Sequence, residues 1–205
     1  FNELDEARFI VARIKEWMDQ GYPLSDCAIL YRNNAQSRVL EEALLQETIP
    51  YRIYGGLRFF ERQEIKDALA YLRMINHPLD DAAFERVVNT PTRGMGDKTL
   101  SQIREIARDT EQSMWQTSIM MLQEKRLNGR ASNALQGFVD LIMNMSNDIK
   151  PLPLDKQADH VIKASGLVAM YQAEKGEKAK ARVENLEELV TACKQFEVPE
   201  EADDM

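Results

Sequence analysis

The chain has 205 residues, of which 44% are apolar and 29% are charged, and its formal net charge is −8. This is the composition of a globular chain, and no apolar run approaches the roughly 18 residues that a membrane span needs. The acidic balance excludes a protein that coats nucleic acid through bulk positive charge, because such binding rests on many Lys and Arg contacts to phosphates. Any DNA contact must therefore be local.

Ligands for a metal or for covalent catalysis are scarce. The two cysteines, Cys27 and Cys193, lie far apart, and His77 and His160 are the two histidines. No CxxC pattern, Walker-type glycine loop, Ser–His or Cys–His arrangement occurs, so we expect no metal site, no catalytic residue and no cofactor held by this chain alone. The cysteine usage and the absence of a signal peptide favour a cytoplasmic protein.

The first quarter of the chain alternates predicted helices and strands. Residues 3–20 have the apolar spacing of an amphipathic helix, and a second such helix lies around residues 39–44. The short apolar runs 27–31 and 50–54 are typical of buried strands. This order predicts part of a parallel α/β layer whose remaining strands lie outside the sequence, because two strands do not form a stable sheet alone.

After Gly55 and Gly56 the pattern becomes helical throughout. A strong helix is predicted at 62–76, and further helices at about 80–89, 97–109, 113–125, 130–147, 155–164, 167–174 and 178–196. The fold class is therefore mainly α, with a small α/β part at residues 1–54 and an all-helical part at 55–205. The glycine pair is a candidate hinge between them, or an ordinary turn that closes a strand.

One local motif is suited to phosphate binding. Gly94 and Gly96 form a Gly-x-Gly turn that opens directly into a helix, so backbone amides and the positive end of the helix dipole can approach an anion. Lys98 and Thr99 can add donors, and Arg93 can add charge. Because amides recognise phosphate rather than base edges, such a turn would bind duplex DNA without sequence preference.

The charge around this turn supports the same reading. Between residues 86 and 108 five basic residues stand against two acidic ones, a local net charge of +3. The alternative is that Asp97 caps the helix and that both glycines only shape a tight turn, since a lone GxG is weak evidence.

Two further sets of polar residues are candidates for DNA contacts. Arg62, Lys66 and Arg73 share one face of the predicted helix 62–76 and could follow a duplex backbone, or could form a solvated face with nearby acids. Arg32 and Asn34 follow the first predicted strand, where open α/β sheets commonly bind ligands, although an Asn-rich turn with a capped helix explains them equally well.

Longer stretches of the sequence resemble a known family. Residues 28–38, 51–67 and 89–96, together with 174–178 and 183–190, resemble the UvrD/PcrA/Rep family of superfamily 1 DNA helicases. The likeness extends over essentially the whole chain. The family usually has Ile where this chain has Met95, a change that keeps an apolar side chain between the glycines.

The resemblance implies an ATP-dependent motor that moves 3′ to 5′ on single-stranded DNA and unwinds duplexes in excision and mismatch repair. We expect this chain to be an internal piece of it. Residues 1–54 would be part of the second RecA-like (2A) subdomain, and residues 55–205 a helical 2B-type subdomain, incomplete at its C-terminal end. The full-length helicase would bind ATP and Mg through motifs outside this chain, which alone would be inactive.

The resemblance also implies roles for individual residues. Arg32 and Asn34 would line the single-strand path, and the glycine turn would hold duplex DNA through Gly94, Gly96, Lys98 and Thr99. The Gly55–Gly56 hinge would let the helical part swivel. A second hypothesis makes the helical part a protein-interaction or autoinhibitory module that docks a repair protein or a second helicase copy; weak dependence on salt would favour it.

Overall fold

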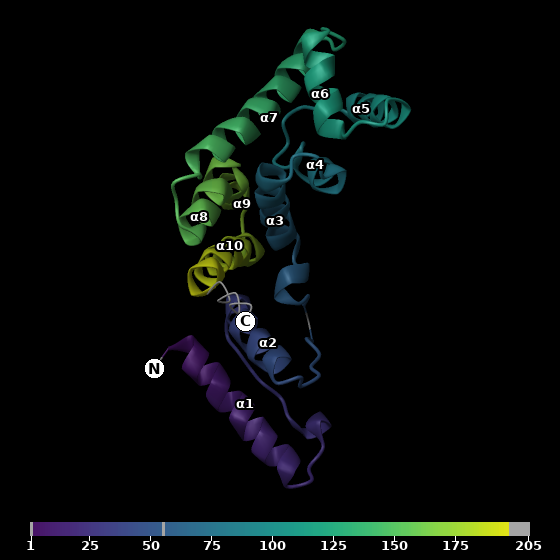
Figure 1. Ribbon diagram of the computed structural model, residues 1–205. Coiled ribbons are helices and arrows are strands. Elements are labelled where there is room, and N and C mark those ends of the chain that lie inside the picture. Colours follow the sequence, from purple (N-terminus) through teal and green to yellow (C-terminus); the bar gives the residue numbers. More distant parts are fainter. Residues whose placement is uncertain (1, 55, 197–205) are drawn as a thin grey trace, which may run out of the picture.

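The structure, a computed structural model, describes residues 2–54 and 56–196, which form ten α-helices and three short 3-10 helices. In Figure 1, α1 and α2 occupy one end of an elongated molecule, α5, α6 and α7 the other, and α10 lies between. The elements are α1 (Glu3–Asp19), η1 (Leu24–Asp26), η2 (Asn34–Gln36), α2 (Ser37–Gln46), η3 (Phe59–Glu61), α3 (Gln63–Asn76), α4 (Asp81–Val87), α5 (Asp97–Asp109), α6 (Met114–Gln123), α7 (Gly129–Asp148), α8 (Leu154–Ala164), α9 (Leu167–Ala173) and α10 (Glu177–Gln195).

Side-chain caps mark four of the ten α-helix starts among the described residues. The side chains of Asn2, Asp80, Ser113 and Asn128 each accept a hydrogen bond from a backbone amide of the first turn that follows. Such caps satisfy amides that have no partner within the helix. The prediction of a mainly helical chain is confirmed, and the helices lie close to the predicted ranges.

The two predicted strands are not formed. Within the described residues, 27–31 and 50–54 have no strand assignment, although Ile29 and Tyr51 pack against the core that α1 and α2 share. Leu30 is 95% exposed and Tyr54 is 84% exposed, although both belong to runs that the pattern assigns to a buried sheet. The prediction of strands was wrong here because a strand exists only through hydrogen bonds to a neighbouring strand, and neither run has such a neighbour among the residues that the structure describes.

Two separate hydrophobic cores divide the described residues. The smaller core joins α1 and α2 and the segment that follows them, through Ala7, Val11, Val39, Leu44 and Ile49. The larger core is built around α3, which packs against α4, α7, α8 and α10. This arrangement is compatible with the predicted boundary at residue 54, which stays a prediction.

Large side chains fill the core of the helical part. Tyr71 and Met74 of α3 are fully buried, and the rings of Phe84 and Phe138 meet edge to face with centroids 5.5 Å apart. Met95, the residue between the two glycines, is 3% exposed and belongs to the same core. The Met95 side chain therefore anchors the loop that carries the glycines to the hydrophobic core.

The last described helix returns to the first part of the chain. The guanidinium of Arg38 in α2 donates from Nε to Glu188 of α10 at 2.6 Å and from Nη2 to Gln195 at 2.8 Å. It also pairs with Glu42, one turn along its own helix, at 2.7 Å. Side chains of α10 thus connect the two parts, as its position in Figure 1 indicates.

Candidate nucleic-acid interface

The glycine turn, residues 89–99, connects α4 to α5. Gly94 has a φ of +82°, a conformation that favours glycine, whereas Gly96 is extended and is the N-cap residue of α5. No side chain caps this helix, so its first amides, including those of Asp97 and Lys98, have no intrahelical or capping partner. The alternative in which Asp97 caps the helix is wrong, because Asp97 is the first helical residue.

Asn89 fixes the shape of the glycine turn from inside. Its Nδ2 donates to the carbonyl oxygen of Met95 at 2.9 Å, and its Oδ1 accepts from the amide of Arg93 at 2.8 Å. One amide side chain therefore ties both halves of the turn together. No local pattern in the sequence singles out Asn89 for this role.

Arg93 was expected to supply charge to DNA, but in the structure its guanidinium forms internal hydrogen bonds. Its guanidinium donates to the carbonyl oxygens of Val87 at 3.0 Å, Pro91 at 3.1 Å and Ser165 at 3.0 Å, and to the Tyr71 hydroxyl at 2.6 Å. The same group lies over the rings of Tyr71 and Phe138. Arg93 is thus a half-buried internal support that links the turn to α3 and to the α8–α9 connection.

Acidic neighbours neutralise most of the basic charge predicted around the turn. Arg86 pairs with Asp67 at 2.8 Å and Arg104 with Glu85 at 2.6 Å, while Arg108 lies 3.6 Å from its neighbour in sequence, an aspartate. The count of +3 in residues 86–108 therefore overstates the charge that this surface offers a ligand.

The charge next to the glycines comes from Lys98 and from a residue that sequence reasoning missed. Lys98 is exposed in the first turn of α5, and Thr99 behind it is half-buried. A Cβ added to Gly94 would lie 3.8 Å from Nη2 and 3.9 Å from Nε of Arg130, in the first turn of α7. A cation at a helix N-terminus is unfavourable for the helix itself, so helix stability does not explain Arg130. Only tertiary structure brings it beside the turn.

The basic residues of α3 do not act as one stripe. Lys66 is exposed, and Arg73 is exposed with Asp80 3.6 Å away. Arg62, which sequence spacing placed on the same face, is only 8% exposed and is bonded internally. Lys66 and Arg73 remain candidate duplex contacts, but the expected continuous track of three residues is wrong.

Arg32 and Asn34 lie at the start of η2, and both side chains are exposed. The bend is shaped by its own residues: the Asn33 side chain accepts from the amide of Ala35, and the Gln36 side chain accepts from the amides of Arg32 and Asn33. The predicted capped Asn-rich turn is therefore present. It leaves the two candidate single-strand contacts free to meet a ligand.

Of the candidate hinge glycines, Gly55 lies outside the described residues. Gly56 is exposed, and a Cβ added to it would meet nothing within 4 Å. No steric reason therefore requires glycine at position 56. The hinge role stays a prediction.

Comparison with known proteins decides the family. Residues 1–205 match the UvrD-like helicase C-terminal domain. The chain belongs to this family. The UvrD-like chain is 63% identical to DNA helicase II of Escherichia coli and 58% identical to DNA helicase II of Haemophilus influenzae, over 205 residues in both cases. It is 39% identical to the ATP-dependent DNA helicase PcrA of Bacillus subtilis over 197 residues, 96% of the chain.

The match confirms the family resemblance seen in the sequence, but it covers a limited part of each relative. The UvrD-like chain spans 28% of the two DNA helicase II proteins and 26% of PcrA. No helix among the described residues of the UvrD-like chain is both long and apolar enough to cross a bilayer.

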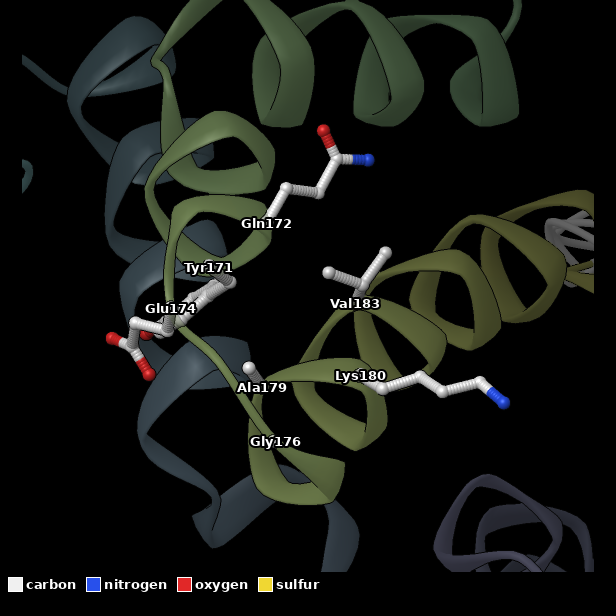
Figure 2. Close-up of a pocket in the computed structure, with 7 residues that line it drawn as sticks. All are labelled: Tyr171, Gln172, Glu174, Gly176, Ala179, Lys180 and Val183. Atoms are coloured by element: carbon white, nitrogen blue, oxygen red, sulfur yellow. The ribbon is translucent and has the colours of Figure 1, made fainter.

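A pocket of about 300 Å³ lies where α9 turns into α10. Figure 2 shows Gln172 and Val183 beside the space between the two helices, whereas Glu174 and Lys180 extend from opposite sides. Ligand pockets usually have a few polar groups that converge on one point. The charged groups here diverge, so this pocket does not favour a small-molecule site in the UvrD-like chain.

The pKa of Asp67 in α3 is a prediction that a pH titration can test. Burial raises the pKa of its carboxyl above the ordinary value of 3.8, in spite of the ion pair with Arg86. The folded UvrD-like chain then binds this proton more tightly than the unfolded chain. Its contribution to stability therefore increases as pH falls through the folded pKa and is complete below 3.8. Carbon-13 NMR titration should give a midpoint above 3.8; a lower midpoint would mean that Arg86 outweighs burial.

Proposed function

We propose that this chain is the DNA-binding portion of an ATP-dependent 3′ to 5′ DNA helicase that unwinds duplex DNA in excision and mismatch repair. The observation that carries the proposal is the uncapped start of α5 at the glycine turn, with Lys98 and the Arg130 guanidinium beside it. The names of the relatives, DNA helicase II and ATP-dependent DNA helicase PcrA, support the same class of activity.

In this proposal the glycine turn contacts the duplex backbone. The first amides of α5 donate to a phosphate oxygen, and the helix dipole adds positive potential at the same point. Lys98 and Arg130 neutralise charge from two sides, and Thr99 adds a hydroxyl. Lys66 and Arg73 extend the contact along α3. None of these groups reads a base edge, so the motor can act on any sequence.

Single-stranded DNA is assigned to Arg32 and Asn34. The guanidinium can pair with a phosphate, and the amide can hydrogen-bond a base or a sugar. ATP and Mg would bind to parts of the helicase outside this chain, because its sequence contains no Walker-type loop. The chain would then contribute DNA binding to the motor and no hydrolytic step.

The proposal is tested by measuring anisotropy of a labelled DNA hairpin with a 3′ single-stranded tail at several salt concentrations. Lys98→Ala and Arg130→Ala should each weaken binding and reduce the slope of log affinity against log salt by about one. Lys178→Ala, which removes the same charge from an exposed site in α10, is the matched control and should leave the slope unchanged.

Gly94→Ala tests the backbone itself. A side chain at a φ of +82° is strained by about 1–2 kcal/mol, so circular dichroism must first show that the variant is folded. A folded Gly94→Ala chain should bind the hairpin more weakly than the unmodified chain. If the folded variants and the unmodified chain bind equally, or none of them binds, the turn is structural.

The paired arginines favour a second function for the rest of the helical surface. With Arg86 and Arg104 neutralised by Asp67 and Glu85 and a net charge of −8, that surface suits a protein partner better than DNA. The alternative is an interaction or autoinhibitory module for a repair protein or a second helicase copy. Binding of such a partner through apolar contacts should depend little on salt.

A further inference from the structure

The segment assigned to single-stranded DNA is held by side chains of the helical part. Nδ2 of Asn33 donates to Oε2 of Glu184 in α10 at 2.8 Å, and Nη1 of Arg62 donates to the carbonyl oxygen of Asn34 at 2.9 Å. Both bonds join residues far apart in the sequence. They act on the two residues that set the direction of the Asn34 side chain.

Arg62 is the centre of this contact. Besides Asn34, its guanidinium donates to Oδ1 of Asn185 at 2.8 Å, to Oγ of Ser37 at 2.7 Å and to the carbonyl oxygen of Leu57 at 3.3 Å. One side chain thus bonds to the first residue of η2, to two residues that follow η2 and to α10. Its planar fork of donors fixes their relative positions more closely than a single bond could.

The acceptors around Arg62 are themselves fixed. Asn185 is 3% exposed, and its Nδ2 donates to Oε1 of Glu64 at 2.6 Å. The Ser37 hydroxyl donates to Oε1 of Glu41 at 2.8 Å, and that carboxylate also accepts from the amide of Phe59. Each member is bonded on more than one side, so the network favours a single arrangement of η2 against α10.

Stability alone does not explain a buried network of this kind. Burial lowers the pKa of Arg62, because the charged guanidinium is removed from water. Apolar residues of similar volume often stabilise a fold equally well or better, and buried polar networks can instead specify one geometry. The geometry specified here is that of the backbone at Asn33 and Asn34.

We infer that Arg62, Asn185 and Glu184 are positioning residues for single-strand binding. They hold the η2 backbone against α10 so that the exposed Arg32 and Asn34 side chains are presented to the strand in one orientation. The inference rests on the proposed single-strand contact at Arg32 and Asn34. The ligand is the sugar-phosphate backbone of a single DNA strand, and the positioning residues themselves need not touch it.

Glu184 gives the sharpest test because it is only half-buried and can be changed without removing the core. Glu184→Gln and Glu184→Ala lose the same charge, but glutamine keeps an oxygen that can accept from Asn33 and alanine does not. The 205-residue chain is titrated with labelled oligo-dT and with a blunt duplex. We expect Glu184→Ala to bind oligo-dT about fivefold more weakly than Glu184→Gln, with equal duplex affinity.

Two further variants separate the inference from the function on which it rests. Asn185→Ala, confirmed as folded by circular dichroism, should weaken oligo-dT binding by about tenfold and leave duplex affinity unchanged. Arg32→Ala tests the contact directly. If Arg32→Ala weakens oligo-dT binding but Glu184→Ala and Glu184→Gln bind oligo-dT equally, the positioning role is wrong and the proposed single-strand contact at Arg32 is supported. If Arg32→Ala has no effect, or the unmodified chain does not bind oligo-dT, both are wrong.

Discussion

Replacing Arg93 with alanine is expected to destabilise the chain by about 3–5 kcal/mol, because several buried polar groups then lose their donor at about 1–3 kcal/mol each. The groups are the carbonyl oxygens of Val87, Pro91 and Ser165, together with the Tyr71 hydroxyl. Burial raises the pKa of Tyr71 to about 12, so this hydroxyl stays protonated and still donates to the carbonyl oxygen of Thr90, but its oxygen loses the bond from Arg93. Urea unfolding followed by circular dichroism measures the loss.

Arg108→Ala is the matched control for Arg93→Ala. It removes the same charge from the same stretch of chain, but the Arg108 side chain is 79% exposed, and its ion pair among the described residues is with its neighbour in sequence. Its effect should lie within about 0.5 kcal/mol of zero. A loss below about 1 kcal/mol for Arg93→Ala, accompanied by a large loss of DNA affinity, would instead return Arg93 to the DNA-binding surface.

The structure and the sequence agree where local signals decide. Helix α5 begins and ends at the predicted residues, Asp97 and Asp109. The signals for these bounds are the glycine turn before the helix, the helical spacing of its apolar residues and the residues of its last turn, and all of them lie within one short segment. Helices α8 and α9, which Gly166 separates with a φ of +86°, lie within one residue of their predicted bounds. Their bounds do not depend on distant parts of the chain.

Local signals failed where distant partners decide. Arg62 and Arg93 look like surface cations in a helical pattern, but Asn185 and Ser165 turn them inward. Arg130 was missed because no pattern in its own part of the sequence indicates that it lies beside Gly94. Whether an arginine side chain points to solvent or to the interior depends on hydrogen-bond acceptors from distant parts of the chain, which neither periodicity nor spacing reveals.

The two unformed strands failed for a related reason. The residue pattern of a strand reflects a preference for a half-buried pleated surface, and residues 2–54 and 56–196 provide no neighbouring strand for residues 27–31. The polar bend at η2 keeps its shape without that sheet, because Asn33 and Gln36 bond its backbone locally. The bend that carries Arg32 and Asn34 is therefore formed although the predicted sheet is not, and its contact with a single DNA strand stays a prediction.

The second large effect is expected at the contact between α2 and α10. The Arg38 side chain is 2% exposed, and its partner Glu188 is 12% exposed. Burial raises the pKa of the Glu188 carboxyl, which Arg38 partly offsets. Arg38→Ala leaves this carboxylate buried without its cation, so we expect a loss of about 3–5 kcal/mol in urea unfolding at neutral pH.

The double variant Arg38→Met/Glu188→Leu should recover most of that loss, because it removes both charges and keeps apolar volume. The single variants Arg38→Met and Glu188→Leu form a thermodynamic cycle with this double variant, and a coupling of about 1–3 kcal/mol is expected for groups in direct contact. A coupling near zero would mean that α10 is held to the first part of the chain by other contacts, including the bond between Asn33 and Glu184. A large coupling would make the ion pair a main restraint on α10, and any motion of the helical part that separates α10 from α2 would have to break it.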